Sequence, residues 1–342
     1  MAAYASFGFD ADMMDLYPAL TTGAAVCIIP EELRLNLSLL NRYYQENSVT
    51  HVFMTTQMGR MFAAHFPESS LTHLTTGGEK LTPVEPPKNY TLTNAYGPTE
   101  CTILTTTQEV DRLYDRIPIG LPLSNVKLYV ADSQGNELPP GALGELWIAG
   151  LGVGRGYLNL PEKTAEAFLP NPFCSDPGFD RIYRTGDVVR RLADGRIDFI
   201  GRNDGQVKIR GFRIELTEVE GVIRDYPGIR DVTVQAFEDE AGSGKYIAAY
   251  VTSDDTVDFD SLGQFIRSRK PSYMVPAAFM QLDAIPLNQN QKVNKRALPK
   301  PVRREETSEY VEPATPLERE LCGKYAAILH FPVLEIMILP EP

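Results

Sequence analysis

Short apolar runs alternate with segments of helical periodicity through the first hundred residues of the chain. One apolar run covers residues 24–30, and a second, His51–Met54, follows a stretch with helical spacing from about Leu35 to Asn47. Helical spacing resumes after the second run and continues through Met61. Strands that are apolar throughout and separated by helices are typical of a parallel sheet covered on both faces. The pattern therefore predicts an α/β unit in which ligands gather at the strand ends.

From about residue 111 to residue 202, apolar and polar positions alternate with a period of two. Val126–Val130 and Glu145–Ile148 are predicted strands, and turn sequences occur at residues 132–135 and 194–195. Alternation interrupted by short turns is typical of hairpins. This stretch is therefore predicted to be a β-rich unit.

A mixed pattern follows Arg202 and predicts a small α+β unit of roughly a hundred residues. After two strands, its predicted elements are a helix near Leu216–Tyr226, strands at Val232–Ala236 and Ile247–Val251, a helix near Phe259–Arg269 and a strand at Phe279–Leu282. Residues 300–316 are rich in Pro, Arg and Glu and are typical of a linker. We thus expect four parts: residues 1–111, 112–202, 203–300 and 301–342.

Composition narrows the class of protein. The 342 residues are 43% hydrophobic and 23% charged, with a net charge of -12, which is typical of a globular protein. The acidic balance argues against binding to nucleic acid or to an anionic membrane, because both require basic patches. No apolar run reaches about 18 residues, the length that a membrane-spanning helix needs.

Cysteine and histidine patterns give no sign of a metal site or a disulfide framework. The four cysteines are far apart in the sequence, and the four histidines lack metal-ligand spacing. They are Cys27, Cys101, Cys174 and Cys322, and His51, His65, His73 and His330. We expect reduced thiols, a cytoplasmic location and structural histidines.

Candidate chemistry is concentrated in the segment Asn94–Glu100. Its Gly97-Pro98 pair predicts a tight bend that neither a helix nor a strand can continue. Around the bend, Tyr96 offers a stacking face, Thr99 a hydroxyl donor for phosphate, and Glu100 a ligand for a hard cation. By itself the segment could equally be an ordinary turn, so its meaning depends on the rest of the chain.

Further glycine-rich and charged motifs follow in a fixed order. They are Phe9–Asp10, Gly144–Gly150, Arg155–Leu158, Tyr183–Asp187, Gly201–Gly211, Tyr273–Pro276 and Asn290–Val293. Singly, such motifs more often mark hairpins than sites. As an ordered set with residues 94–100, they resemble the adenylation domain of a nonribosomal peptide synthetase, within the wider group of adenylate-forming enzymes. The resemblance covers residues 1 to about 300.

The resemblance implies a partial adenylate-forming core, made of an α/β sheet layer and a β-rich subdomain, with a small mobile α+β domain after it. It also implies a reaction in two steps. A carboxylate attacks the α-phosphate of ATP, and the acyl group then passes to a phosphopantetheine thiol on a carrier domain. Mg²⁺, a lysine and hydroxyl or amide donors would be required to neutralise and align the two anions.

The resemblance also assigns the nucleotide site. Glu100 would ligate Mg²⁺ and, with Thr99 and Lys292, act in catalysis. Asp187 would accept hydrogen bonds from the ribose, although a turn cap after Thr185-Gly186 is the alternative. The remaining residues expected at ATP or AMP are Gly77, Gly78, Glu79, Asn94, Ala95, Tyr96, Gly97, Phe199 and Arg202.

Lys292 lies in a polar loop, Asn288–Asn294, and by the family pattern would bridge the substrate carboxylate and the phosphate. The loop departs from the usual pattern, with Gln291 in place of glycine and Asn294 in place of an acidic residue. Phe199 departs as well, since related domains often carry tyrosine there. A hinge is implied at Asp204, with Lys292 serving the first step and the face that carries Lys208 and Gly211 serving the second.

Asp10 favours an amino-acid substrate over an acyl chain, because a carboxylate in the pocket can pair with an α-ammonium group. The expected pocket carries no other charge except Lys292, so a neutral, medium-sized side chain is predicted, either polar or aliphatic. Its expected residues are Asp10, Ala11, Met14, Gln57, Thr75, Gly77, Ala95, Ile103, Leu104 and Lys292.

The sequence contains no Ser/Thr/Gly-rich, lysine-containing phosphate loop before Phe9, so we expect an N-terminally truncated core with little activity alone. Residues 310–321 resemble the start of a carrier domain. The expected partners are therefore the amino acid, a carrier domain and other synthetase modules. Two alternatives stay open, which are a fragment of an acyl-coenzyme A or aryl-acid ligase and a non-catalytic docking or structural remnant.

Overall fold

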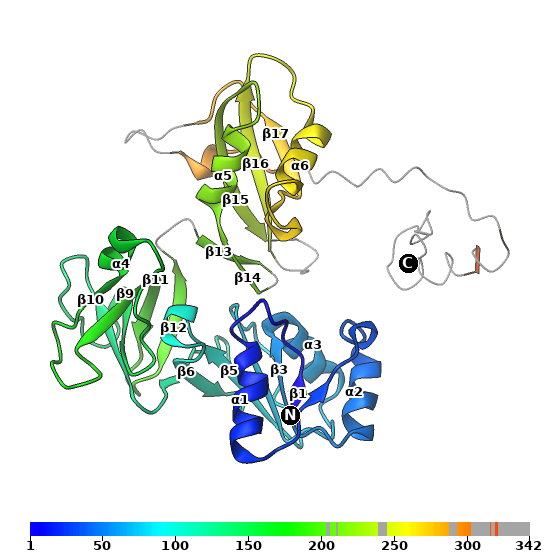
Figure 1. The fold of residues 1–342 in the computed structure, drawn as a ribbon, viewed down its shortest axis with the longest axis vertical. Coiled ribbons are helices and arrows are strands. Elements are labelled where there is room, and N and C mark those ends of the chain that lie inside the picture. The colour runs from blue at the N-terminus through cyan, green and yellow to red at the C-terminus, as the bar shows by residue number, and fades with distance from the viewer. Residues whose placement is uncertain are drawn as a thin grey trace.

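The structure, a computed structural model, describes residues 1–202, 206–209, 211–238, 245–286, 293–301, 315 and 319–320. Lys292 and Asp204, two of the predicted site residues, lie outside these ranges. Three sheet-containing units follow one another along the chain, and Figure 1 shows the third lying above the other two. No helix in the described ranges has the length and apolar character needed to cross a bilayer.

The first unit is built on a five-stranded sheet in the order β3-β4-β5-β6-β7. Strands β3, β4 and β5 are parallel, and β3 is the apolar run predicted at His51–Met54, whereas β6 and β7 add two antiparallel strands. The strands are β3 (His51–Thr55), β4 (His73–Gly77), β5 (Thr91–Tyr96), β6 (Thr106–Glu109) and β7 (Leu121–Pro122). The helices are α1 (Asp12–Thr22), α2 (Leu37–Glu46) and α3 (Thr56–His65), with 3-10 turns η1 (Glu31–Leu33) and η2 (Thr99–Cys101).

Two local details differ from the sequence-based expectation. The apolar run at residues 24–30 forms only the short strand β2 (Cys27–Ile28), because its partner β1 (Ala2–Ala3) is equally short. The helix expected from Leu35 begins at Leu37, since the Asn36 side chain accepts a hydrogen bond from the backbone N–H of Leu39 and caps the helix there.

The second unit is an antiparallel sheet in which β10, β11, β9 and β8 are neighbours and β12 pairs with β11. Its strands are β8 (Val126–Ala131), β9 (Leu143–Gly150), β10 (Phe168–Pro170), β11 (Arg181–Arg191) and β12 (Ile197–Arg202), with the helix α4 (Pro161–Ala167). Buried residues of β8, β9 and β11 share a core with Tyr96 of the first unit. This packing fixes β11 beside the end of β5.

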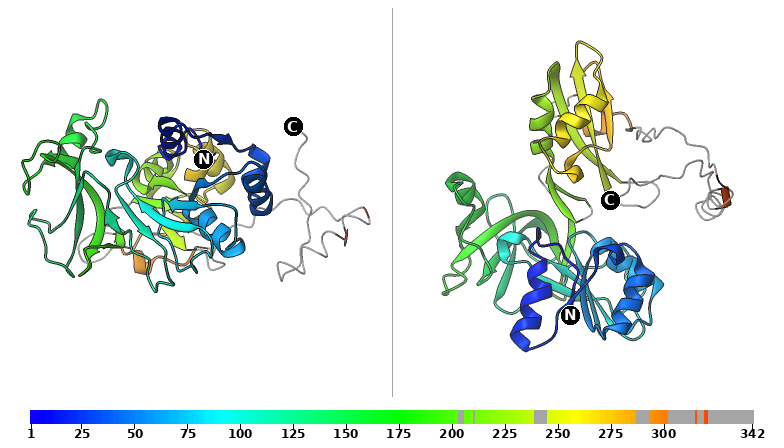
Figure 2. Two further views of the ribbon diagram at one scale, coloured as in Figure 1. Left: turned by 90° about the horizontal axis from the view of Figure 1, so that it is seen from below. Right: turned by 45° about the vertical axis from the view of Figure 1, so that its right-hand side comes forward.

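The third unit begins with a hairpin, β13 (Gln206–Ile209) and β14 (Phe212–Glu215), followed by a three-stranded sheet in the order β15-β16-β17. The strands are β15 (Ile229–Glu238), β16 (Lys245–Ser253) and β17 (Ala278–Gln281). The helices are α5 (Leu216–Arg224) and α6 (Phe259–Arg267), with 3-10 turns η3 (Ser272–Met274) and η4 (Lys295–Ala297). Ile209 and Ile214 join the hairpin to the buried core of this unit. Figures 1 and 2 show the hairpin directed at the end of the first sheet.

Candidate active site

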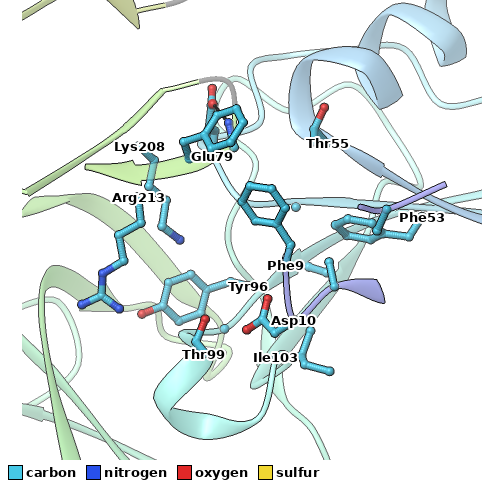
Figure 3. A pocket seen from close by; sticks show the side chains of 18 of the residues that line it. Phe9, Asp10, Phe53, Thr55, Glu79, Tyr96, Thr99, Ile103, Lys208 and Arg213 are labelled. Atoms are coloured by element: carbon cyan, nitrogen blue, oxygen red, sulfur yellow. Dashed lines mark hydrogen bonds between the residues drawn. The ribbon is translucent and has the colours of Figure 1, made fainter. Parts of the chain in front are cut away.

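A cavity of about 680 Å³ lies where the strands of the first sheet end, below the β13–β14 hairpin. This volume falls within the usual range for small-molecule sites. Figure 3 shows Phe9, Asp10, Tyr96 and Thr99 around the cavity, with Lys208 entering from the hairpin. The walls therefore come from all three units of the chain.

A second cavity of about 610 Å³ adjoins the first. Tyr96, Asp187, Arg202 and Lys208 line both cavities, so these residues stand between them. Phe199 lines only the second cavity, and its ring centroid lies 6.5 Å from that of Tyr96. The two spaces can thus accommodate two chemically different parts of one ligand, or two ligands in contact.

Asp187 is buried at the boundary, with 5% of its surface exposed. Its Oδ2 accepts a hydrogen bond from the Tyr96 hydroxyl, and its Oδ1 lies 2.5 Å from Nη1 of Arg202. The pKa of Asp187 is raised, because the effect of burial is larger than the opposing effects of Arg202 and Tyr96. The carboxylate is thus bonded to Tyr96 and Arg202 and lines both cavities.

The bend at Gly97 is required by close packing. A Cβ atom at this position would lie 2.2 Å from the carbonyl oxygen of Ile103, which no side chain tolerates. Thr102 and Ile103 themselves have positive φ angles of 59° and 70°, so the segment after the bend folds back tightly. The Asn94 side chain holds the strand before the bend by donating to the carbonyl oxygen of Pro118 at 2.8 Å. These contacts present Thr99 and Ile103 to the first cavity.

Residues 77–79 form a second loop at the cavity edge. Gly78 has φ of 103°, and the Thr56 hydroxyl bonds both backbone groups of Glu79, accepting from its N–H at 3.0 Å and donating to its carbonyl at 3.1 Å. The Glu79 carboxylate accepts from the backbone N–H of Gly211 at 2.5 Å. This contact joins the first unit to the turn of the β13–β14 hairpin.

The hairpin places two cations beside the site. Lys208 and Arg213 are directly paired in the β13–β14 register, so their side chains leave the same face of the hairpin. Burial lowers the pKa of Lys208, although the nearby Asp187 favours its charged form. Lys208 therefore places an ammonium group, whose charged form burial disfavours, on the wall that the two cavities share.

Glu100 is nearly buried and heavily bonded. Its carboxylate accepts from the Tyr157 hydroxyl at 2.8 Å, and Nη1 of Arg213 lies 2.9 and 2.8 Å from its two oxygens. Burial alone would raise the pKa of Glu100, but Arg213 and Tyr157 outweigh it and hold the pKa below its usual value. Glu100 is therefore ionised, and its charge is balanced by Arg213.

A divalent metal here would have few protein ligands. Within the described ranges, no group of three or more His, Cys, Asp or Glu residues could hold one. A single carboxylate with phosphate oxygens and water is nevertheless a common arrangement for Mg²⁺. Glu100 and the neighbouring Thr99 fit that arrangement, and Mg²⁺ is the group that their oxygens would suit.

Most of the sequence-predicted site residues meet at the two cavities. Those lining the first are Asp10, Ala11, Met14, Gln57, Gly77, Gly78, Glu79, Ala95, Tyr96, Gly97, Thr99, Ile103, Leu104, Asp187 and Arg202. Asn94 and Phe199 line only the second. Thr75 lies on the same face of β4 as Gly77, one pleat further from the strand end, and does not line either cavity. Glu100 lines neither cavity, but it is paired with Arg213, which lines the first.

Sequence reasoning missed Arg213, Tyr157 and Tyr183. Tyr183 lines the first cavity, and its hydroxyl lies beside that of Tyr157, the donor to Glu100. Arg213 could have been found from the hairpin register, because it pairs with Lys208, which was already predicted to face the site. Both tyrosines lie in motifs that the sequence analysis singled out, Arg155–Leu158 and Tyr183–Asp187, but no role was assigned to them.

Comparison with known proteins agrees with this geometry. Residues 1–158 match the family model of AMP-binding enzymes, and residues 218–292 match the model of the AMP-binding enzyme C-terminal domain. Bacitracin synthase 1 of Bacillus licheniformis is 44% identical over 300 residues, which are 88% of this chain and 6% of that protein. Surfactin synthase subunit 2 of Bacillus subtilis is 40% identical over 96% of this chain and 9% of the synthase. The chain therefore spans less than a tenth of the length of these synthases.

Solved structures give the same result. Holo-PA1221, a nonribosomal peptide synthetase protein with adenylation and carrier domains, has a TM-score of 0.73 and 26% identity, over 97% of this chain and 57% of that chain. The four-domain synthetase AB3403, solved with AMP and glycine, has a TM-score of 0.54 and 35% identity, over 96% of this chain and 25% of that chain. The chain belongs to the AMP-binding, adenylate-forming ligases, as an adenylation domain of the nonribosomal peptide synthetase type.

Proposed function

We propose that this chain forms much of a site that activates an amino acid with ATP and passes it to a carrier-domain thiol. The observation that carries the proposal is the placement of Asp10 in the same cavity as Tyr96, Asp187 and Arg202. One carboxylate suits an α-ammonium group, and the buried cluster suits a nucleotide. The two would meet where carboxylate and α-phosphate must react.

In the first step, a carboxylate oxygen of the amino acid attacks the α-phosphorus, and the bond to the bridging oxygen of pyrophosphate breaks. Asp10 would hold the ammonium group, and Asp187 would accept from the ribose hydroxyls with lone pairs that Tyr96 and Arg202 leave free. Glu100, with Thr99, would hold Mg²⁺, which when bound neutralises phosphate charge. Lys292 would bridge the two anions, by the family pattern.

The second step would use the arrangement seen in this structure. The sulfur of a carrier thiol attacks the carbonyl carbon of the aminoacyl-adenylate, and the thiol proton passes to solvent. The bond from this carbon to the phosphate oxygen breaks, and AMP leaves with the bonding electrons. Lys208 lies on the wall shared by the two cavities and would stabilise the departing phosphate. The Glu79–Gly211 hydrogen bond supports this docked position of the hairpin.

The substrate side of the cavity is mostly neutral. Met14, Ile103 and Leu104 supply apolar surface, while Gln57 supplies one amide. Glu31 and Arg34 also line the cavity, but they form an ion pair with each other at 2.9 Å. We propose an amino acid with a neutral side chain of medium size, because these two charges are already paired. Thr75 would contact the substrate only if the side chain of the amino acid were long enough to reach past Gly77.

Calorimetry with a non-hydrolysable aminoacyl-adenylate analogue tests the proposal. We expect the 342-residue chain to bind the analogue. Asp187→Asn should lower the affinity about 10- to 100-fold, and the exposed control Asp176→Asn should leave the affinity unchanged. Asp10→Ala should weaken the aminoacyl analogue but not an acyl analogue without the amino group. If Asp10→Ala weakens neither analogue, the acyl or aryl-acid ligase is favoured. If the parent chain binds neither analogue, the non-catalytic remnant is favoured. Pyrophosphate exchange by the same chain tests the expectation of little activity.

A further inference from the structure

The contact between Arg213 and Glu100 joins two parts of the molecule that are 113 residues apart in sequence. Arg213 belongs to β14 of the hairpin, and Glu100 to the 3-10 turn that follows the Gly97 bend. The Glu100 side chain is 9% exposed and that of Arg213 is 35% exposed. The ion pair therefore exists only while the hairpin lies against the first unit.

The guanidinium covers the side of Glu100 that a metal would need. One nitrogen, Nη1, lies within hydrogen-bond distance of both carboxylate oxygens, and the Tyr157 hydroxyl donates a second hydrogen bond to Oε1. Mg²⁺ requires direct contact with an oxygen at about 2.0–2.1 Å in near-octahedral geometry. A guanidinium and a hydrated divalent cation cannot both occupy this position, because they overlap and repel each other.

Glu100 also needs one of the two. Without either cation, the nearly buried carboxylate would keep, among the described residues, the Tyr157 hydroxyl and a backbone N–H as partners but no positive charge, which is costly for a buried ion. Tyr157 does not depend on the hairpin, since it belongs to the second unit. The two cations are therefore alternatives for the same anion, and each one compensates for the absence of the other.

We propose that Arg213 competes with a divalent cation for Glu100, so that docking of the β13–β14 hairpin and binding of the metal at Glu100 exclude each other. The inference rests on the proposed function, in which the metal accompanies the phosphates of the first step. Under it, the hairpin docks on the site only after the metal has left with pyrophosphate. Arg213 is thus a positioning residue that orders the two steps.

Mn²⁺ in the presence of a non-hydrolysable ATP analogue provides the probe, because free Mn²⁺ is counted directly by electron paramagnetic resonance. We expect Arg213→Gln to bind Mn²⁺ more tightly than the parent chain by at least about fivefold, the lower end of typical coupling between two sites. Arg213→Lys, which keeps a cation, should fall between them. Arg230→Gln, which removes another arginine of the same unit from its ion pair with Asp254, should leave Mn²⁺ affinity unchanged.

Hydrogen exchange supplies the second readout. In the parent chain, saturating Mn²⁺ should speed amide exchange in residues 206–209 and 211–215, whereas nucleotide with a chelator should not. In Arg213→Gln, exchange there should already be fast and should not respond to Mn²⁺. Glu100→Gln should lose the Mn²⁺ response as well, which keeps the test informative if Arg213→Gln folds poorly.

Equal Mn²⁺ affinity in the parent chain and Arg213→Gln, or a hairpin that stays protected at saturating Mn²⁺, would overturn the competition. So would failure of every variant to bind Mn²⁺ while nucleotide is bound. Calorimetry of the ATP analogue in chelator separates these results from a failure of the proposed function. If the parent chain binds no nucleotide there, the proposed function is wrong; if it binds nucleotide normally, only the role of Arg213 is.

Discussion

The Tyr96 hydroxyl donates a hydrogen bond to the buried carboxylate of Asp187, across 91 residues of sequence. Tyr96 stabilises the ionised form of Asp187, whose pKa burial has raised. Nucleotide binding through ionised Asp187 should therefore weaken, as pH falls, at a higher pH than for an ordinary aspartate. Tyr96→Phe should shift this loss to still higher pH, which calorimetry of an adenylate analogue between pH 4.5 and 8 would measure. An unshifted profile would mean that Asp187 is not the titrating group.

The Gly97 bend predicts a sharp sensitivity to a single methyl group. In Gly97→Ala, the new Cβ would overlap the carbonyl oxygen of Ile103, so the free energy of unfolding should fall by about 1–3 kcal/mol and the Thr99 loop should move. Gly221→Ala is a matched control, because it lies in α5 with open space around its Cβ position and should stabilise the chain by up to about 1 kcal/mol. Urea denaturation of both variants checks the pair.

Asp15 predicts a pH-dependent contribution to stability. Burial raises its pKa from 3.8 to about 6, against two hydrogen bonds from the backbone N–H groups of Tyr4 and Ala5. The folded chain thus holds this proton more tightly than the unfolded chain, so the stabilisation is complete below about pH 4 and is lost as pH rises through about 6.

Between pH 4.5 and 7.5 the loss from Asp15 alone should be about 2 kcal/mol. Asp15→Asn should remove this component, while the exposed control Asp254→Asn should retain it. Urea denaturation of the three proteins at both pH values provides the measurement. If the parent and Asp15→Asn chains show the same pH dependence, the carboxyl ionises normally in the folded state.

Removing the hydroxyl oxygen of Tyr44 should stabilise the folded chain. Its ring is fully buried between α2 and the first sheet, and its hydroxyl has no hydrogen-bond partner among the described residues. Tyr44→Phe should raise the free energy of unfolding by about 1 kcal/mol, since the cost of an unpaired buried hydroxyl disappears. Tyr43→Phe is the control. Its hydroxyl donates to the carbonyl of Ile28 at 2.8 Å, so that variant should lose about 0.5–1 kcal/mol in thermal or urea denaturation.

The local pattern of the sequence predicted the strands and helices with clear periodicity, because these depend on neighbouring residues, but it did not predict α1, β5 or β11. It predicted the parallel strand β3 from the apolar run at His51–Met54, for example. It did not predict that Glu79 would bond Gly211, or that Arg213 would cover Glu100. These contacts depend on how the third unit docks on the first, and no periodicity encodes that docking. The family resemblance supplied the residues of the site, but not the state of the hairpin.

The division of the cavity walls has a consequence for engineering. Asp10, Met14, Gln57 and Ile103 all fall within the first 104 residues, whereas Lys208 and Arg213 enter from the hairpin. A chimaera that exchanges residues 1–104 between relatives would therefore replace the contacts to an amino-acid side chain as one cassette. Lys208 and Arg213 of the recipient would be retained. Selectivity for the amino-acid side chain could therefore be exchanged without changing the residues with which the third unit docks.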